Sequence, residues 1–136
     1  MKKIIVNRLD FERIRKCIND AKQFKSISAK EAGNLLQELE SAEIFEPEAI
    51  PSNVVTMNSI VRMSFVNTSK QIQFQIVYPN QANMKENKIS IFSPIATALI
   101  GYKVGDEIEW IIPAGLTKIH IDEIVYQPEA SGHYNL

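Results

Sequence analysis

The stretch ISIFSPIATALIGYKVGDEIEW, residues 89–110, carries the local signals that decide the fold. Ser93 and Pro94 predict the start of a helix, because serine favours the N-cap and proline the first helical position. Apolar residues then recur at helical spacing as far as Gly101, a residue type that commonly ends helices. From residue 107 to 112 charged and apolar residues alternate, which is typical of a strand. This stretch therefore predicts a strand, a short helix and a second strand.

Alternation with a period of two occurs on both sides of this stretch. Apolar side chains occupy every second position in residues 61–65 and 72–78, which predicts two half-buried strands. The turn residues 113–115 separate the strand at 107–112 from a partner strand over 116–126. Together these segments predict an antiparallel sheet with one helix packed on it.

The last predicted strand changes its parity along its length. Ile119 and Ile121 point to one face, whereas Ile124 and Tyr126 point to the other. A β-bulge inserts one extra residue and so restores a common face. We therefore expect a bulge near residues 122–123, which would keep all four side chains in the core.

The N-terminal third has helical periodicity instead. Asp10 is predicted to be the N-cap of an amphipathic helix that ends near Phe24. Residues 28–31 match a capping box, and an apolar stripe follows it to about Glu43. Two helices with a short connection must lie antiparallel, so a coiled-coil-like helical hairpin is expected. Its tip would consist of Lys22, Gln23, Phe24, Lys25 and Ser26.

The sequence divides into three segments. Pro47 and Pro51 lie close together, stop the second helix and indicate a linker at residues 46–52. Residues 1–45 are then the helical hairpin, and residues 53–136 form the domain built on the sheet. The fold class predicted is α+β, with segregated helices followed by strands.

Composition limits the classes of protein to which the chain can belong. Its 136 residues are 45% hydrophobic and 23% charged, close to the averages for soluble globular proteins. No apolar run approaches the roughly 18 residues that a membrane span needs, so no membrane association is expected. The single cysteine, Cys17, cannot form an internal disulfide, which agrees with a reducing compartment. We therefore expect a cytoplasmic protein.

Charge is distributed unevenly although the net charge is only −1. Residues 1–30 hold nine basic and three acidic residues, whereas residues 31–52 hold six glutamates and no base. The simplest interpretation is that the two predicted helices pair their charged flanks. The basic helix lacks the interleaved aromatic residues of single-strand binders, so no independent nucleic-acid binding is expected.

No group of residues points to catalysis or to a cofactor. His120 and His133 lack the spacing of a metal cluster, and neither forms a recognisable pair with a nucleophile. The glycine patterns that bind nucleotides are absent. The carboxylates near the predicted hairpin of strands are expected to form a solvated face: Asp106, Glu107, Glu109, Asp122 and Glu123. We therefore expect no catalytic residue, no metal and no cofactor.

Taken in order, residues 89–110, the turn at 113–115 and residues 124–126 resemble the C-terminal domain of the Gre transcript cleavage factors. Within that superfamily, VVTMNS at 54–59 and YQPEASG at 126–132 are similar to the regulators of nucleoside diphosphate kinase. The resemblance implies an FKBP-like fold without prolyl isomerase activity. It also implies docking on the rim of the RNA polymerase secondary channel, through Ser93, Pro94, Ile95 and Ala96.

The resemblance also indicates what the helical hairpin would do. In Gre factors the coiled coil enters the channel, and acidic residues at its tip help to hold a catalytic magnesium ion. Here the predicted tip has Lys22 and Lys25 and no carboxylate, so the oxygen ligands that magnesium requires are missing. A helix of about 15 residues is also only ~22 Å long. We therefore expect a regulator that competes with Gre factors without stimulating transcript cleavage.

Two other functions are compatible with the sequence. The first is a protein-interaction module that regulates the level or activity of nucleoside diphosphate kinase, directly or through expression. The second is an FKBP-type prolyl isomerase, which would need an aromatic-lined pocket. A pull-down from cell extract would separate the kinase module from a polymerase-binding regulator, and a proline-peptide assay would test the isomerase.

Overall fold

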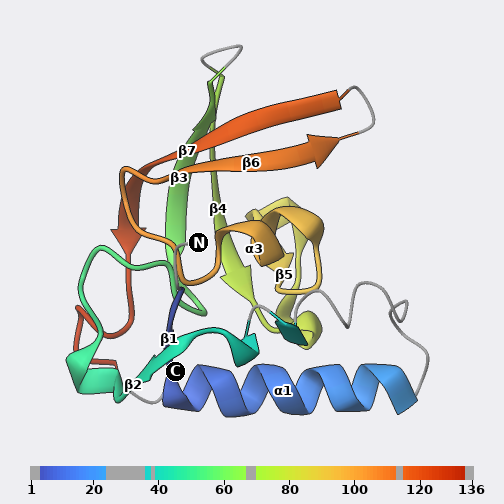
Figure 1. The fold of residues 1–136 in the computed structure, drawn as a ribbon, viewed down its shortest axis with the longest axis vertical. Helices are drawn as coiled ribbons and strands as arrows, with labels where there is room; N and C mark the ends of the chain where they lie inside the picture. Colours follow the sequence, from blue (N-terminus) through green and yellow to red (C-terminus); the bar gives the residue numbers. More distant parts are fainter. Residues whose placement is uncertain (1–3, 24–35, 38, 67–69, 113–114, 134–136) are drawn as a thin grey trace.

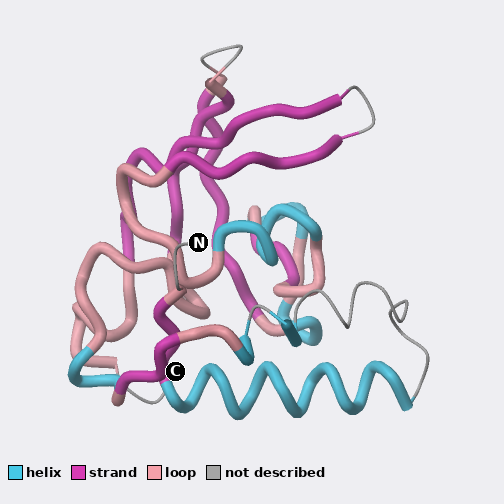
Figure 2. Tube along the Cα trace, in the orientation of Figure 1, coloured by secondary structure: helices cyan, strands magenta, loops and turns pink. Residues whose placement is uncertain are grey.

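The computed structural model describes residues 4–23, 36–37, 39–66, 70–112 and 115–133, with the backbone alone for residues 21–23, 94, 110–112 and 115. Its centre is a five-stranded sheet on which helices pack (Figures 1 and 2). In spatial order the strands are β5 (Lys88–Ser90), β4 (Gln71–Val77), β3 (Ile60–Phe65), β7 (Gly115–Tyr126) and β6 (Glu107–Ile112). The predicted mixture of helices with a sheet is confirmed.

The sheet is mixed, so the prediction of a purely antiparallel sheet is wrong at one edge. The β3–β4, β3–β7 and β6–β7 pairs are antiparallel, but β5 runs parallel to β4 and pairs Lys88 with Gln75. The reason is the connection between these two strands. It turns back through two short 3-10 helices, η2 (Pro79–Gln81) and η3 (Met84–Glu86), and returns the chain in the direction of β4.

The predicted bulge in β7 is confirmed, but the expectation that it keeps all four side chains in the core is wrong for Tyr126, which does not pack with Ile119, Ile121 and Ile124. Arg62 pairs with Glu123 and Met63 with Ile121, which leaves Asp122 as an extra residue in β7. A second irregularity lies where β3 begins, between Ile60 and Val61. The first bulge lets Ile119 and Ile121 remain fully buried although the parity changes beyond them.

One hydrophobic core joins the N-terminal segment to the sheet. Helix α1 (Arg8–Gln23) buries Ile14 and Ile18 completely, and both belong to the cluster that contains Val61 and Met63 of β3. Short strand β1 (Ile5–Asn7) pairs in parallel with β2 (Glu43–Phe45), so the start of the chain contacts the residues that precede the predicted linker. In Figure 1, α1 extends along one end of the molecule, beside this small sheet.

The predicted linker is itself packed. Pro47 is buried and begins 3-10 helix η1 (Pro47–Ala49), and Ile50 is buried against Ile5 and Val54. The division into residues 1–45, 46–52 and 53–136 stays a prediction. In the described part of the chain, residues from both sides of the linker share one core.

Helix α1 begins earlier than predicted, because Asn7 rather than Asp10 serves as its N-cap. The Asn7 Oδ1 atom accepts hydrogen bonds from the N–H groups of Leu9 (2.7 Å) and Asp10 (3.4 Å). Asp10 lies in the first turn with its side chain buried. The correction has a physical basis: asparagine and aspartate are equally good caps, so preference alone cannot choose between them.

The helical hairpin is only partly within the described residues. Lys22 and Gln23 are the last two residues of α1, and residues 36, 37, 39 and 40 are helical. The remaining tip residues, Phe24, Lys25 and Ser26, lie outside the described residues. The antiparallel arrangement and the tip therefore stay predictions.

The short helix α3 (Pro94–Leu99) is confirmed, with one change in its capping. Ser93 occupies the N-cap position, but its hydroxyl donates to the carbonyl of Ser90 instead of capping α3. Gly101 follows the helix with a φ of +84°, which favours glycine. A Cβ atom at this position would lie 2.5 Å from the Cβ of Ile4, so the N-terminal segment also requires glycine here.

Candidate partner-binding site

Residues 93–96, predicted to dock on a partner and here called the docking loop, are fixed to the end of β5 by hydrogen bonds. Ser90 Oγ accepts from the N–H of Phe92 (3.0 Å), and Ser90 O accepts from Ser93 Oγ (2.8 Å). Thr97 Oγ1 donates back to the carbonyl of Ile91 (2.8 Å), which joins α3 to the end of β5. A braced loop of this kind could present side chains with little loss of conformational entropy on binding.

The four predicted docking residues differ in their exposure to solvent. Ser93 and Ile95 are half-buried and keep some exposed surface, whereas Ala96 is fully buried in the core. Pro94 begins the helix, and its side chain lies outside the description. The Ala96 side chain therefore packs in the core beneath α3 and cannot itself contact a partner. Docking stays a prediction, with Ser93 and Ile95 as the described side chains that are available for it.

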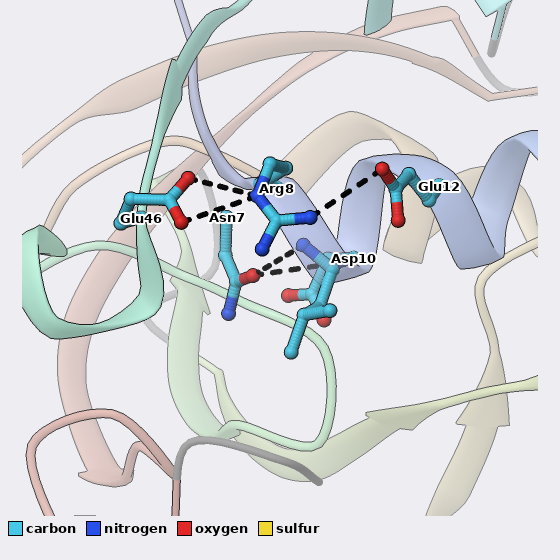
Figure 3. A network of polar contacts seen from close by, with 6 residues as sticks. Asn7, Arg8, Asp10, Glu12 and Glu46 are labelled. Carbon is cyan, nitrogen blue, oxygen red and sulfur yellow. Dashed lines mark hydrogen bonds and ion pairs between the residues drawn. The ribbon is translucent and has the colours of Figure 1, made fainter.

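A buried polar network lies where α1 begins, at the same end of the sheet as the loop that follows β5. Glu129, from the segment after β7, is buried and accepts hydrogen bonds from Asn7 Nδ2 (2.7 Å) and Thr56 Oγ1 (2.8 Å). The Thr56 hydroxyl is also 2.9 Å from that of Ser59. Figure 3 shows the other side of Asn7, whose oxygen faces the N–H groups of the first turn of α1. One asparagine thus connects the helix to the C-terminal segment.

Asp10 is the second carboxylate of this network. Its oxygens accept from the N–H of Met57 (3.1 Å) and from the Tyr78 hydroxyl (3.3 Å). Burial, together with the nearby charge of Glu129, raises the pKa of Asp10 to about 7. Burial likewise raises the pKa of the Tyr78 phenol above its usual range. The hydrogen bonds with Met57 and Tyr78 oppose the effect of burial on Asp10 but do not cancel it.

The two stretches that resemble the kinase regulators meet in this network. Besides the bond between Thr56 and Glu129, Gln127 Nε2 donates to the carbonyls of Val54 (2.7 Å) and Pro51 (2.8 Å). Residues 54–59 and 126–132 are therefore one structural unit, although the sequence separates them widely. The sequence reasoning missed Glu129 and misassigned Asp10. An acidic or polar residue at a position flanked by apolar ones was the signal that could have found them.

Outside the polar network, Arg8 forms a surface group with two acids. Its guanidinium donates to Glu46 (2.8 Å) and more weakly to Glu12 (3.5 Å), as Figure 3 shows. All three side chains are largely exposed, so these ion pairs contribute little to stability.

The predicted solvated face of the sheet is polar as expected. Glu107, Glu109 and Glu123 are exposed, and Glu123 forms an ion pair with Arg62 (2.9 Å). Partial burial raises the pKa of Asp122, but hydrogen bonds from His120, Gln71 and Ser64 outweigh this effect and lower it overall.

The described residues hold no ready-made site for a metal. Among them, no group of three or more histidine, cysteine, aspartate or glutamate side chains could bind a metal ion. His133 instead lies 2.6 Å from the Tyr126 hydroxyl, far along the chain from His120. None of the described helices is both long and apolar enough to span a membrane. The buried network is enclosed and fully hydrogen-bonded, so it is suited to holding elements together and not to chemistry on a substrate.

Comparison with known proteins places these features in a family. The family described as "Transcription elongation factor, GreA/GreB, C-term" matches residues 50–126, which include the docking loop and residues 54–59. The regulator of nucleoside diphosphate kinase of Escherichia coli (strain K12) is 36% identical over 134 residues, which are 98% of this chain and 96% of that protein.

Longer elongation factors and a solved structure are also similar. The transcription elongation factor GreA of Orientia tsutsugamushi (strain Boryong) is 41% identical over 95 residues, 70% of this chain and 60% of that protein. The structure of the prokaryotic transcription elongation factor GreA/GreB from Nitrosomonas europaea is 36% identical with a TM-score of 0.74, and the alignment covers 93% of this chain and 100% of that one. These relatives are named as a regulator and as elongation factors, not as catalysts. The chain therefore belongs to the GreA/GreB superfamily, together with the regulators of nucleoside diphosphate kinase, and is a transcription-factor-like regulator.

Proposed function

We propose that this chain binds RNA polymerase near the secondary channel and competes there with Gre factors, without stimulating transcript cleavage. The observation that carries the proposal is the combination of a Gre-type domain over residues 50–126 with a short N-terminal segment. The domain contains the predicted docking loop, and the predicted tip of the N-terminal segment holds no carboxylate in its sequence.

The length and charge of the N-terminal segment support the absence of cleavage activity. Helix α1 has 16 residues and so is about 24 Å long, which is short for reaching a buried active site. The predicted tip carries Lys22 and Lys25, and a magnesium ion with its water would require carboxylate oxygens there. A protein with the docking loop but without these ligands would occupy the channel rim and do no chemistry.

Docking would depend on the exposed part of the loop at the start of α3. Ser93 offers its hydroxyl oxygen as an acceptor, because its proton is donated to the carbonyl of Ser90. Ile95 offers an apolar surface and is positioned by its packing against the core. A few well-placed side chains commonly supply most of the binding energy in such interfaces. Replacing both should therefore weaken binding without changing the sheet.

The test is binding of the full chain to core RNA polymerase, with a Gre factor as competitor. The Ser93→Ala, Ile95→Ala variant should bind at least about fivefold more weakly. Val104→Ala, which truncates a partly exposed apolar side chain elsewhere, should bind as wild type does. Thermal unfolding of each variant checks that the fold is intact. No binding at about 50 µM, or no competition, would refute the proposal.

A transcript cleavage assay tests the second half of the proposal. A halted polymerase should show no added cleavage when this chain is present, and cleavage driven by a Gre factor should fall as the chain displaces it. Stimulated cleavage by the wild-type chain would contradict the reasoning from the tip residues.

A second candidate is a module that regulates nucleoside diphosphate kinase, favoured by the name of the Escherichia coli relative. It predicts a complex with the purified kinase or a change in the amount of kinase in cells. A direct complex seen by analytical ultracentrifugation, in the absence of polymerase binding, would put this function first.

A further inference from the structure

The structure also contains a polar cavity. Its lining residues lie between Asn58 and Lys88, the first residue of β5, whereas the docking loop follows β5. The cavity has a volume of about 420 Å³, within the range of sites that bind small ligands or short peptide segments. Carboxamide side chains from β4, the loop before β3 and the β4–β5 connection dominate its lining: Asn58, Gln75, Asn80, Gln81 and Asn83. Each carboxamide carries both a donor and an acceptor.

Several of these groups are available to a ligand. Within the described residues, the carboxamides of Asn80 and Gln81 are exposed and make no internal hydrogen bond. Gln75 Nε2 donates to the carbonyl of Asn58 (2.8 Å), which leaves the Gln75 carbonyl oxygen as an acceptor. The Asn83 side chain is not free in this way. It accepts from the N–H of Lys85 (3.1 Å) and donates to the Glu86 carboxylate (3.3 Å), and so stabilises the turn that forms one wall of the cavity.

The wall of the cavity is built from well-defined backbone. Asn83 and Lys88 exchange backbone hydrogen bonds of 2.9 Å, which closes the loop that contains η3. Asn58 adopts a left-handed conformation (φ 67°), and its N–H donates to the carbonyl of Ile76 (2.7 Å). The carboxamides are therefore presented by short turns whose ends are fixed.

The charge of the lining argues against an anionic ligand. Lys88 is the cation of the lining, and its ammonium lies 3.1 Å from the Glu86 carboxylate. Among the described residues no aromatic side chain lines the cavity, so the stacking surface that a sugar ring or a nucleobase favours is missing. A neutral ligand that alternates donors and acceptors fits this lining best.

Met84, which follows the lining residue Asn83 in the sequence, supplies an exposed apolar side chain. It lies between Asn83 and Glu86 on η3, and its side chain is 80% exposed, more than any other large apolar side chain in the described part of the chain. Methionine adapts to varied apolar partners and is common at peptide-binding surfaces. Carboxamides beside an exposed methionine match a polypeptide, which carries amides in its main chain and apolar groups on its side chains.

We infer that this cavity binds the main chain of a short, uncharged polypeptide segment through Asn80, Gln81 and Gln75, and that Met84 contacts one of its side chains. The peptide takes the place of water on carboxamides that the fold leaves unpaired. This site is separate from the docking loop and does not depend on polymerase binding.

The test uses ¹⁵N nuclear magnetic resonance of the full chain, because the side-chain NH₂ signals of Asn80 and Gln81 report directly on the cavity. The probe is a capped peptide of alternating glycine and valine, with maltose and uridine as the other ligand classes. The peptide should give saturable shifts of these signals, with a dissociation constant of about 1 mM or lower. Maltose and uridine should not.

Two variants test the roles of the residues. Asn80→Ala with Gln81→Ala should weaken peptide binding about five- to tenfold, the effect of losing one or two net hydrogen bonds. The matched control, Asn19→Ala with Gln37→Ala, removes two exposed carboxamides elsewhere and should leave the affinity unchanged.

Met84→Ala should weaken binding of the valine-containing peptide and leave that of an all-glycine peptide unchanged. The inference is overturned by any of three results. These are the absence of a saturable shift up to about 20 mM peptide, a larger response to maltose or uridine, or wild-type affinity in the cavity variant.

Discussion

The stability of this protein should fall as the pH rises from about 5 to about 8, and Asp10→Asn should remove most of that fall. Asp10 is 2% exposed, and burial raises its pKa in the folded chain to about 7 from its ordinary value of 3.8. A raised pKa means that the folded state holds a proton that the unfolded state releases. The associated stability is fully present below the unfolded pKa and is lost as the pH rises through the folded one.

The size of the effect follows from proton linkage. Between a pH of about 4 and a pH of about 7 the slope is close to 1.4 kcal/mol per pH unit, because only the unfolded state releases the proton there. Above it, both states are ionised and the slope vanishes. Between about pH 5 and about pH 8 the loss is thus on the order of 2 to 3 kcal/mol. Such a loss is a sizeable part of the stability of an ordinary domain.

The variant keeps the geometry while removing the charge. An asparagine at position 10 can accept from the N–H of Met57 through its oxygen and donate to the Tyr78 hydroxyl through its nitrogen, because a hydroxyl can reverse its role. It has no ionised form, so it avoids the cost of burying a carboxylate near Glu129 at high pH. The free energy of unfolding of Asp10→Asn relative to wild type should therefore be about 2 to 3 kcal/mol more favourable at about pH 8 than at about pH 5.

The measurement is urea unfolding followed by circular dichroism at several pH values, with the free energy from linear extrapolation. Contributions that the two proteins share cancel in the difference between their curves, so this difference isolates Asp10. Glu12→Gln, which neutralises an exposed acid on the same helix, should retain the wild-type pH dependence. If the wild-type and Asp10→Asn curves stay parallel between about pH 5 and about pH 8, the buried carboxylate does not behave as argued.

Two further substitutions test the packing of the N-terminal segment and the buried network. Gly101→Ala should lower the free energy of unfolding by at least about 2 kcal/mol, because the new Cβ would meet Ile4 and the backbone φ is left-handed. Gly105 has a similar φ but open space around it, so Gly105→Ala should lower the same quantity by only about 1 kcal/mol in the urea assay. Glu129→Ala should lower the free energy of unfolding by about 2 to 3 kcal/mol, because it leaves the buried Asn7 amide and the buried Thr56 hydroxyl without their acceptor. Glu123 is exposed, so Glu123→Ala should lower it by less than about 1 kcal/mol. Equal effects of the two substitutions would argue against the network.

Local patterns were sufficient to predict most of the sheet. The parity change between Ile121 and Ile124 required a bulge, and the extra residue is Asp122. Gly101 ends α3 as expected, because a positive φ is a property of the residue and its immediate neighbours. In each case the physical cause acts within a few residues of the signal, so a single sequence contains it.

Features that depend on distant contacts could not be predicted in this way. The burial of Asp10 is set by Met57 and Tyr78, and Glu129 is ordered by Thr56 across a separation of 73 residues. Similarly, Ala96 was grouped with the docking residues because it lies beside them in the sequence, while the core below α3 buries it completely. No local propensity encodes which face of a helix a distant strand will cover.

The position of the network bears on where partner recognition can occur. Residues 54–59 and 126–132 carry the resemblance to the kinase regulators, yet their polar side chains are buried. Thr56 is bonded to Ser59 and to Glu129, and Glu129 also accepts from Asn7, the N-cap of α1. Gln127 is buried as well and donates to the carbonyls of Val54 and Pro51. Buried side chains cannot contact a partner, so these stretches define how the first helix is held against the sheet domain. Under the proposed function, the orientation of the helical segment is then a built-in property of the chain, and affinity for polymerase must come from exposed groups such as Ser93 and Ile95. Network variants should accordingly change stability and the orientation of the helix. Loop variants should change affinity with a smaller loss of stability, because Ser93 donates one hydrogen bond to Ser90 and Ile95 is only partly buried against the core.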